Sequence, residues 1–124
     1  MTRLRISGPA RADLRDLLAA SRAMLGDDGE ARYAATLAAA MRMIAAAPEG
    51  PNTKDRDDLL PGLRALHARR VRGLHGVRTP VHVIYFRLKA ETIEVVRILH
   101  ERMDPTMHVD RQAATARPAP RRRR

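Results

Sequence analysis

Side chains that could bind a ligand or take part in catalysis cluster at the carboxyl end of residues 94–104. This stretch is rich in β-branched residues and reads Glu-Val-Val-Arg-Ile-Leu-His-Glu-Arg-Met-Asp. Val95, Val96 and Ile98 predict a strand. The polar residues that follow it are His100, Glu101, Arg102 and Asp104, with Pro105 next. Such a cluster is either the solvated end of a sheet edge or a surface that binds or catalyses. The neighbouring elements decide between the two.

The histidines do not predict a metal site. The chain has five histidines and no cysteine, and the histidines share no spacing typical of metal ligands. His82 and His100 alternate onto the strand face assigned below to the core, so they are interpreted as hydrogen-bonded strand-end residues, as is His67. His75 stands in a glycine-flanked turn and is interpreted as solvated. The sequence gives no reason to expect a metal or any other cofactor.

Size and charge predict one small domain with a basic tail. The chain has 124 residues and a net charge of +10, and residues 111–124 hold six arginines and no acid. We therefore expect a folded domain over residues 1–110 and a disordered tail over 111–124. The amino terminus does not resemble a secretion signal and no apolar run could span a bilayer. A cytoplasmic protein without a membrane partner is expected.

Periodicity predicts the order strand, helix, helix and then three strands. Residues 3–6 alternate as a strand, residues 9–25 and 30–47 have helical apolar stripes, and residues 26–29 are a turn between the helices. A loop is expected over 48–62, strands over 63–71, 81–88 and 92–99, and a closing turn over 106–110. The fold class is α+β: one sheet with an antiparallel helical hairpin on one face and a three-stranded meander at the carboxyl end.

Alternation divides the last hairpin into two faces when its loop is centred on Ala90. The face assigned to the helices carries His82, Ile84, Phe86, Leu88, Val96, Ile98 and His100. The face assigned to solvent carries Val81, Val83, Tyr85, Arg87, Ile93, Val95, Arg97 and Leu99. We therefore expect Tyr85, Arg87 and Arg97 to be available to a partner.

Several motifs resemble the RelE/ParE toxins of type II toxin–antitoxin modules. They are Ala-Arg-Ala-Asp-Leu in the first helix, Tyr33 at the start of the second, Pro61-Gly62-Leu63-Arg64, Pro80-x-His82-x-x-Tyr85-x-Arg87 and Arg97-Ile98-Leu99-His100-x-Arg102-Met103-Asp104. The resemblance covers about residues 2–110. Its most specific part is the carboxyl-terminal motif, which is similar to the ParE branch.

The ParE resemblance implies a toxin that inhibits DNA gyrase by binding it, without enzymatic activity, and that arrests growth. It implies a cognate ParD-like antitoxin that forms a hetero-oligomer with the toxin and lays a helix on the hairpin. The residues expected to contact the target are Tyr85, Arg87, Arg97, Arg102, Met103, Met107 and His108. The residues expected to contact the antitoxin are Leu14, Leu18, Leu37 and Met41.

Two alternatives remain open, because fold alone does not choose among functions. A RelE-like protein would be an enzyme, a metal-independent endoribonuclease that cuts messenger RNA on the ribosome. The residues available for that chemistry are Arg64, Arg87, Arg97, Arg102 and His108, but no lysine cluster accompanies them and no tyrosine follows Arg102. The second alternative is a non-toxic binding module that acts in operator regulation with its antitoxin.

Overall fold

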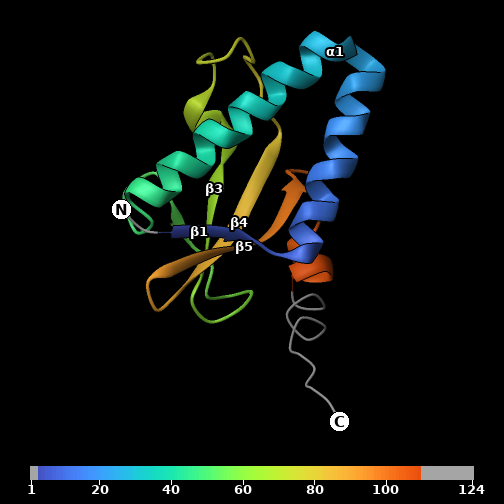
Figure 1. Ribbon diagram of the computed structural model, residues 1–124. Helices are drawn as coiled ribbons and strands as arrows, with labels where there is room; N and C mark the ends of the chain where they lie inside the picture. Colours follow the sequence, from blue (N-terminus) through green and yellow to red (C-terminus); the bar gives the residue numbers. More distant parts are fainter. Residues whose placement is uncertain (1–2, 110–124) are drawn as a thin grey trace.

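The structure is a computed structural model that describes residues 3–109, and it confirms the α+β architecture (Figure 1). The elements are β1 (Arg3–Ile6), α1 (Gly8–Ala46), β2 (Lys54–Asp55), β3 (Leu63–His67), the 3-10 turn η1 (Ala68–Val71), β4 (His82–Lys89), β5 (Thr92–His100) and a helical turn over 105–109. The sheet order is β1-β5-β4-β3-β2. Strand β1 runs parallel to β5, and the other neighbours are antiparallel. No described helix is both long and apolar enough to cross a membrane.

The two predicted helices form one helical run, α1, that folds back on itself at Gly26 (Figure 1). Gly26 has φ of +79°, a conformation that glycine adopts at little cost, and the residues after it are already helical. A Cβ at Gly29 would collide with the Cβ of Leu25. The turn expected over residues 26–29 is therefore a single-residue reversal, closed by the contact of Gly29 with Leu25. At its start, α1 is capped by Ser7, whose hydroxyl oxygen accepts the Ala10 N–H at 3.2 Å.

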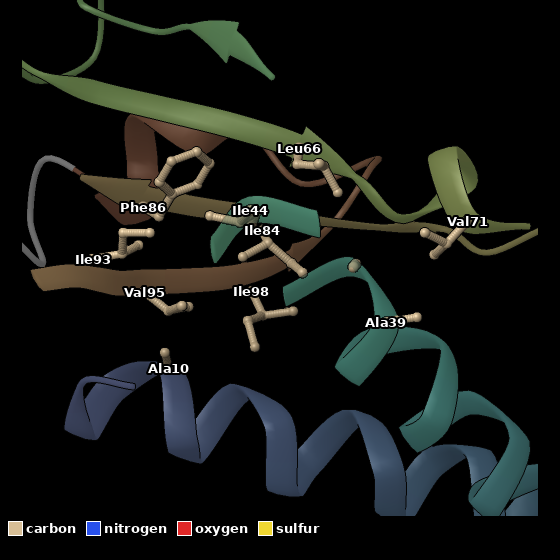
Figure 2. Close-up of a cluster of buried hydrophobic side chains, with 11 residues drawn as sticks. Ala10, Ala39, Ile44, Leu66, Val71, Ile84, Phe86, Ile93, Val95 and Ile98 are labelled. Carbon is tan, nitrogen blue, oxygen red and sulfur yellow. The ribbon is translucent and has the colours of Figure 1, made fainter. Parts of the chain in front are cut away.

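The main core lies between the hairpin and one face of the sheet (Figure 2). Small residues of α1 permit close approach of the helix to the sheet, and large side chains of β3, β4 and β5 fill the space between the two layers. The residues labelled in Figure 2 are Ala10, Ala39, Ile44, Leu66, Val71, Ile84, Phe86, Ile93, Val95 and Ile98. Burial of each large side chain contributes about 1.5–3 kcal/mol, so this layer is what fixes the hairpin on the sheet.

A β-bulge in β5 overturns part of the predicted face assignment. The loop between β4 and β5 has two residues, with Lys89 paired to Thr92. Farther along, Tyr85 pairs with Arg97 while Phe86 pairs with Val95, so Val96 is an extra residue without a partner of its own. One extra residue reverses the alternation on one side of it. The predictions that Ile93 and Val95 face solvent and that Val96 faces the helices are therefore wrong.

The second face of the sheet is also covered, which contradicts the expected exposure of Tyr85, Arg87 and Arg97. A second cluster contains Leu59, Leu63, Ala65, Tyr85, Val96, Leu99 and Val109. The loop around Leu59 and the turn ending at Val109 lie over this face, and Tyr85 is only 5% exposed. The side chains of Arg87 and Arg97 are partly buried in ion pairs.

The loop expected over 48–62 and the strand expected over 63–71 are more finely divided than predicted. Two residues of that loop form β2, which pairs with β3. Strand β3 ends at His67, whose Nδ1 accepts the Arg69 N–H at 3.0 Å and starts η1. The strand prediction for residues 68–71 is therefore wrong. The closing turn is confirmed over 106–109, and the predicted tail lies outside the described residues.

Candidate functional site

Arg97 joins β5, the start of α1 and the carboxyl-terminal turn. Its Nε and Nη2 donate to the two carboxylate oxygens of Asp13 at 2.7 and 2.8 Å. Its Nη1 donates to the His108 carbonyl oxygen at 3.4 Å, and the Ile98 N–H also donates to Asp13, at 2.9 Å. The hydrogen bonds to Asp13 raise the pKa of Arg97 against the opposing effect of burial. The side chains are 16% and 15% exposed, so this pair positions neighbouring segments rather than offering a free cation.

The segment held by Arg97 carries an exposed surface, hereafter the C-terminal surface, formed by Arg102, Met103, Met107 and His108. Met103 is 46% exposed and Met107 is 52% exposed. Val109 is fully buried on the sheet and anchors the turn from below. Methionine suits binding surfaces because its side chain is flexible and polarisable. The arrangement therefore presents two apolar side chains and a cation on a turn that is fixed at its base.

Asp104 orders the start of this turn. Its Oδ1 accepts the Thr106 N–H at 3.1 Å and the Thr106 hydroxyl at 2.7 Å. These hydrogen bonds, led by that of the hydroxyl, lower the pKa of Asp104. The carboxylate is thus a local cap for the turn and not a general base.

The residues named for RNA cleavage do not converge on one site. Arg64 points to the hairpin side of β3, where its Nε and Nη2 donate to the Thr53 hydroxyl oxygen at 3.1 and 2.9 Å. Arg87 pairs with Glu94 near the β4–β5 loop, at 3.4 Å. Of the five, Arg97 and His108 are brought together, with Arg102 on the neighbouring surface. Across residues 3–109, no group of three or more potential metal ligands assembles.

A second surface lies at the tip of the hairpin, where an apolar groove of about 480 Å³ separates α1 from the segment before β4. We call it the hairpin groove; its lining includes Leu17, Met24, Leu25, Tyr33, Val77 and His82. Met24 is 81% exposed and Leu25 is 64% exposed. Met24 and Leu25, directly before the Gly26 reversal, were the sequence signal for this groove. The sequence-based prediction of an antitoxin surface on the hairpin named other residues.

None of the residues predicted to contact the antitoxin is in the lining of this groove. Leu37 is buried, with Leu14 and Leu18 packed against its cluster. Met41 is partly buried against the main core. Leu37 therefore supports the hairpin from inside, while the other three retain some exposed surface.

The floor of the hairpin groove contains a neutral polar pair. The Tyr33 hydroxyl lies 2.6 Å from His82 Nδ1 and accepts the Val81 N–H at 3.1 Å. Burial, reinforced by the nearby His100 and His67, lowers the pKa of His82 to about 4, and burial raises the pKa of Tyr33. Both side chains are uncharged at neutral pH, which keeps the groove floor compatible with an apolar occupant.

Comparison with known proteins places this arrangement in a family. A family model described as the ParE toxin of the type II toxin–antitoxin system parDE matches residues 4–105. Toxin ParE1 of Caulobacter vibrioides is 32% identical over 105 residues, which cover 85% of this chain and 95% of that relative. A solved structure described as the chromosomal ParDE TA system from P. aeruginosa has the same fold, with a TM-score of 0.61 and 20% identity over 81% of this chain and 96% of that one. The chain belongs to the ParE toxin family of type II toxin–antitoxin systems.

Proposed function

We propose that this ParE-family toxin arrests growth by binding and inhibiting DNA gyrase in the cytoplasm, and that its cognate ParD-like antitoxin neutralises it in a hetero-oligomer. Family membership implies an antitoxin partner. The observation that carries the binding mode is the C-terminal surface, which exposes Met103 and Met107 on a turn fixed by Asp13 and Arg97. Apolar side chains on a fixed turn favour protein–protein contact because little backbone conformational entropy is lost on binding.

Binding is favoured over RNA cleavage because the basic residues named for a nuclease are separated. Arg64 and Arg87 lie on different faces of the sheet, and Arg97 is occupied by Asp13. A metal-free nuclease needs its base, cations and acid around one phosphate. In the proposed mechanism Arg102, Met103, Met107 and His108 contact the target, while Tyr85, Arg87 and Arg97 hold the segment and the sheet beneath it.

The hairpin groove is the proposed antitoxin surface. An amphipathic helix can place apolar residues at three- and four-residue spacing into a groove of this kind. The neutral Tyr33–His82 pair adds no charge to the groove floor beneath such a helix, and the charged residue of the lining is Arg32. Met24 and Leu25 would line the contact, and the exposed parts of Leu14, Leu18 and Met41 would extend it along the hairpin.

A supercoiling assay tests the proposed target. Purified full-length toxin added to DNA gyrase should reduce supercoiling in proportion to its concentration, and antitoxin added first should restore it. Supercoiling that stays unchanged over a wide range of toxin concentration would contradict gyrase as the target. Cuts in messenger RNA at ribosomal positions in arrested cells would support the nuclease instead. Normal growth on expression without the antitoxin would support the non-toxic binding module.

Paired variants separate the two surfaces. Met103→Glu/Met107→Glu should weaken gyrase inhibition at least tenfold and leave antitoxin binding within twofold. Met24→Glu/Leu25→Glu is the matched control, since it also places two carboxylates on exposed apolar positions. It should weaken antitoxin binding and leave gyrase inhibition within twofold. Circular dichroism should show that both variants are folded, and loss of both activities in both variants would refute the division into two surfaces.

A further inference from the structure

A basic cleft lies on the face of the sheet away from the main core, and neither the C-terminal surface nor the hairpin groove accounts for its basic residues. We call it the sheet cleft. It has a volume of about 550 Å³. Its lining residues are Asn52, Lys54, Arg56, Ala65, His67, Arg69, Arg70, Val83, Tyr85, Glu101, Met103 and Pro105. The cleft therefore begins at β2, crosses β3 and β4, and ends at Met103, which it shares with the C-terminal surface.

Most of the positive charge in the sheet cleft is not neutralised within the described chain. Lys54, Arg69 and Arg70 are exposed and form no ion pair with any residue from 3 to 109. Arg56 is the exception, because its Nη2 lies 2.9 Å from Asp58 Oδ2. Glu101 is the single acid in the lining. Three cations without an ion pair therefore line the cleft, together with the paired Arg56 and one carboxylate.

Glu101, the acid in the lining, is hydrogen-bonded to His67. His67 Nδ1 accepts the Arg69 N–H at 3.0 Å, so the ring proton resides on Nε2. Nε2 donates to Glu101 Oε1 at 2.7 Å, and this hydrogen bond lowers the pKa of Glu101. One carboxylate oxygen is therefore directed at His67, which also fixes the base of η1 that carries Arg69 and Arg70.

The floor of the cleft supplies a neutral donor. Burial is the main cause that raises the pKa of Tyr85, with Arg56 acting in the opposite direction. The phenol consequently stays protonated at neutral pH and can donate a hydrogen bond. The cleft therefore offers a ligand two kinds of hydrogen-bond donor: the charged groups around its rim and the neutral Tyr85 hydroxyl at its floor.

We propose that the sheet cleft binds the phosphate of a nucleotide or of a single polynucleotide strand. Guanidinium groups pair with phosphate through two parallel hydrogen bonds. A phosphate ester concentrates charge and several acceptor oxygens in one compact group, which matches four cations around one cleft better than the separate single charges of an acidic peptide. The cleft volume lies within the range of ordinary ligand sites. This inference goes beyond gyrase inhibition and does not depend on it.

The test is an NMR titration of the full-length protein at two salt concentrations, with four probes: inorganic phosphate, a mononucleotide, oligouridylate of eight nucleotides and an octaglutamate peptide. The nucleotide probes should shift the backbone amides of residues 54, 69, 70 and 85. If the mononucleotide binds as well as the oligonucleotide, the natural ligand is a free nucleotide. If the oligonucleotide binds more tightly, the natural ligand is a polynucleotide. For a polynucleotide, the logarithm of the association constant falls linearly with the logarithm of the salt concentration. The slope should become shallower by about 0.7 for each phosphate that a variant no longer neutralises.

Charge-reversal variants give the decisive comparison. Arg69→Glu/Arg70→Glu should weaken binding at least tenfold. Arg3→Glu/Arg5→Glu makes the same change in net charge on the exposed side chains of β1, at the far edge of the sheet, and should weaken binding less than threefold. Equal losses in the two variants would overturn the proposal, since they indicate attraction to net charge alone. Octaglutamate binding as tight as the oligonucleotide, or no shifts at the four cleft amides, would also overturn it.

Discussion

At the scale of single residues, Arg97 alternates onto the face assigned to a partner, yet its guanidinium is bound by Asp13. Helix periodicity places Asp13 on the surface of the first arm of α1, and nothing in the local pattern connects it with a strand more than eighty residues later. The parallel insertion of β1 beside β5 makes the connection, because it brings the start of α1 to the end of that edge. A long-range ion pair of this kind is not predictable from local sequence.

Removal of Asp13 should destabilise the fold. Asp13→Ala leaves the largely buried Arg97 guanidinium and the Ile98 N–H without their acceptor. Removing one member of a buried pair costs about 3–5 kcal/mol, and partial exposure reduces this to roughly 2–3 kcal/mol. The measurement is the free energy of unfolding in urea. Asp16→Ala is the control, since its pair with Arg15 is 77% and 75% exposed; an equal loss in both variants would contradict a special role for Asp13.

His82 should make stability depend on pH. Its pKa is about 4 in the folded protein and about 6.5 in an unfolded chain, so the unfolded state binds more protons between these values. Stability is therefore fully present above about pH 6.5 and is lost as the pH falls toward 4. His82→Asn does not titrate and should show a smaller loss of melting temperature over this window. His75→Asn, outside the hairpin groove, should follow the wild-type curve; a wild-type slope retained by His82→Asn would exclude His82 as the cause.

At the scale of elements, the sequence predicted what local chemistry determines. The helical stripe from residue 9 predicted the start of the first helix to within one residue, the turn over 26–29 contained the reversal at Gly26, and alternation predicted β4 and β5 to within a residue or two. The bulge at Val96 was not predictable, because two apolar β-branched residues in succession fit either face of a strand. Strand β2 was missed since it has two exposed residues and exists through pairing with β3. Of the candidate site, the C-terminal surface was predicted, whereas the groove and the sheet cleft depend on tertiary packing.

A glycine substitution in the β4–β5 loop should stabilise the folded protein. Ala90 has φ of +56° and is the only described residue other than glycine with a positive φ. A left-handed conformation costs a residue with a Cβ about 1–2 kcal/mol. Glycine relieves this cost, but its greater conformational entropy stabilises the unfolded chain by roughly 0.4–1 kcal/mol. Ala90→Gly should therefore raise the free energy of unfolding by up to about 1 kcal/mol. Glu91→Gly serves as the comparison and should lower it; stabilisation by both variants would refute backbone strain as the explanation.

At the scale of the whole molecule, both faces of the sheet are covered, by the hairpin on one side and by two short segments on the other. The two proposed protein-binding surfaces lie on separate segments. The hairpin groove lies at the Gly26 reversal. The carboxyl-terminal turn that carries Met107 and His108 lies beside the start of α1 (Figure 1), where Arg97 links the His108 carbonyl to Asp13. An antitoxin on the groove would thus leave the C-terminal surface physically free. Neutralisation then requires either a second contact by the antitoxin or a change transmitted through α1.

The carboxyl-terminal turn should be part of the folded unit rather than an appendage. A chain that ends at residue 104 lacks Val109, which is fully buried against the sheet, and the His108 carbonyl that Arg97 contacts. The exposed apolar face that results should lower the free energy of unfolding by about 2–4 kcal/mol, by analogy with large-to-small core substitutions. A chain that ends at residue 110 keeps both of these contacts and should match the full-length protein within about 0.5 kcal/mol. Urea unfolding of the two truncated chains is the measurement. Equal stability of the two would show that Val109 does not anchor the turn, and the C-terminal surface would then have no rigid base.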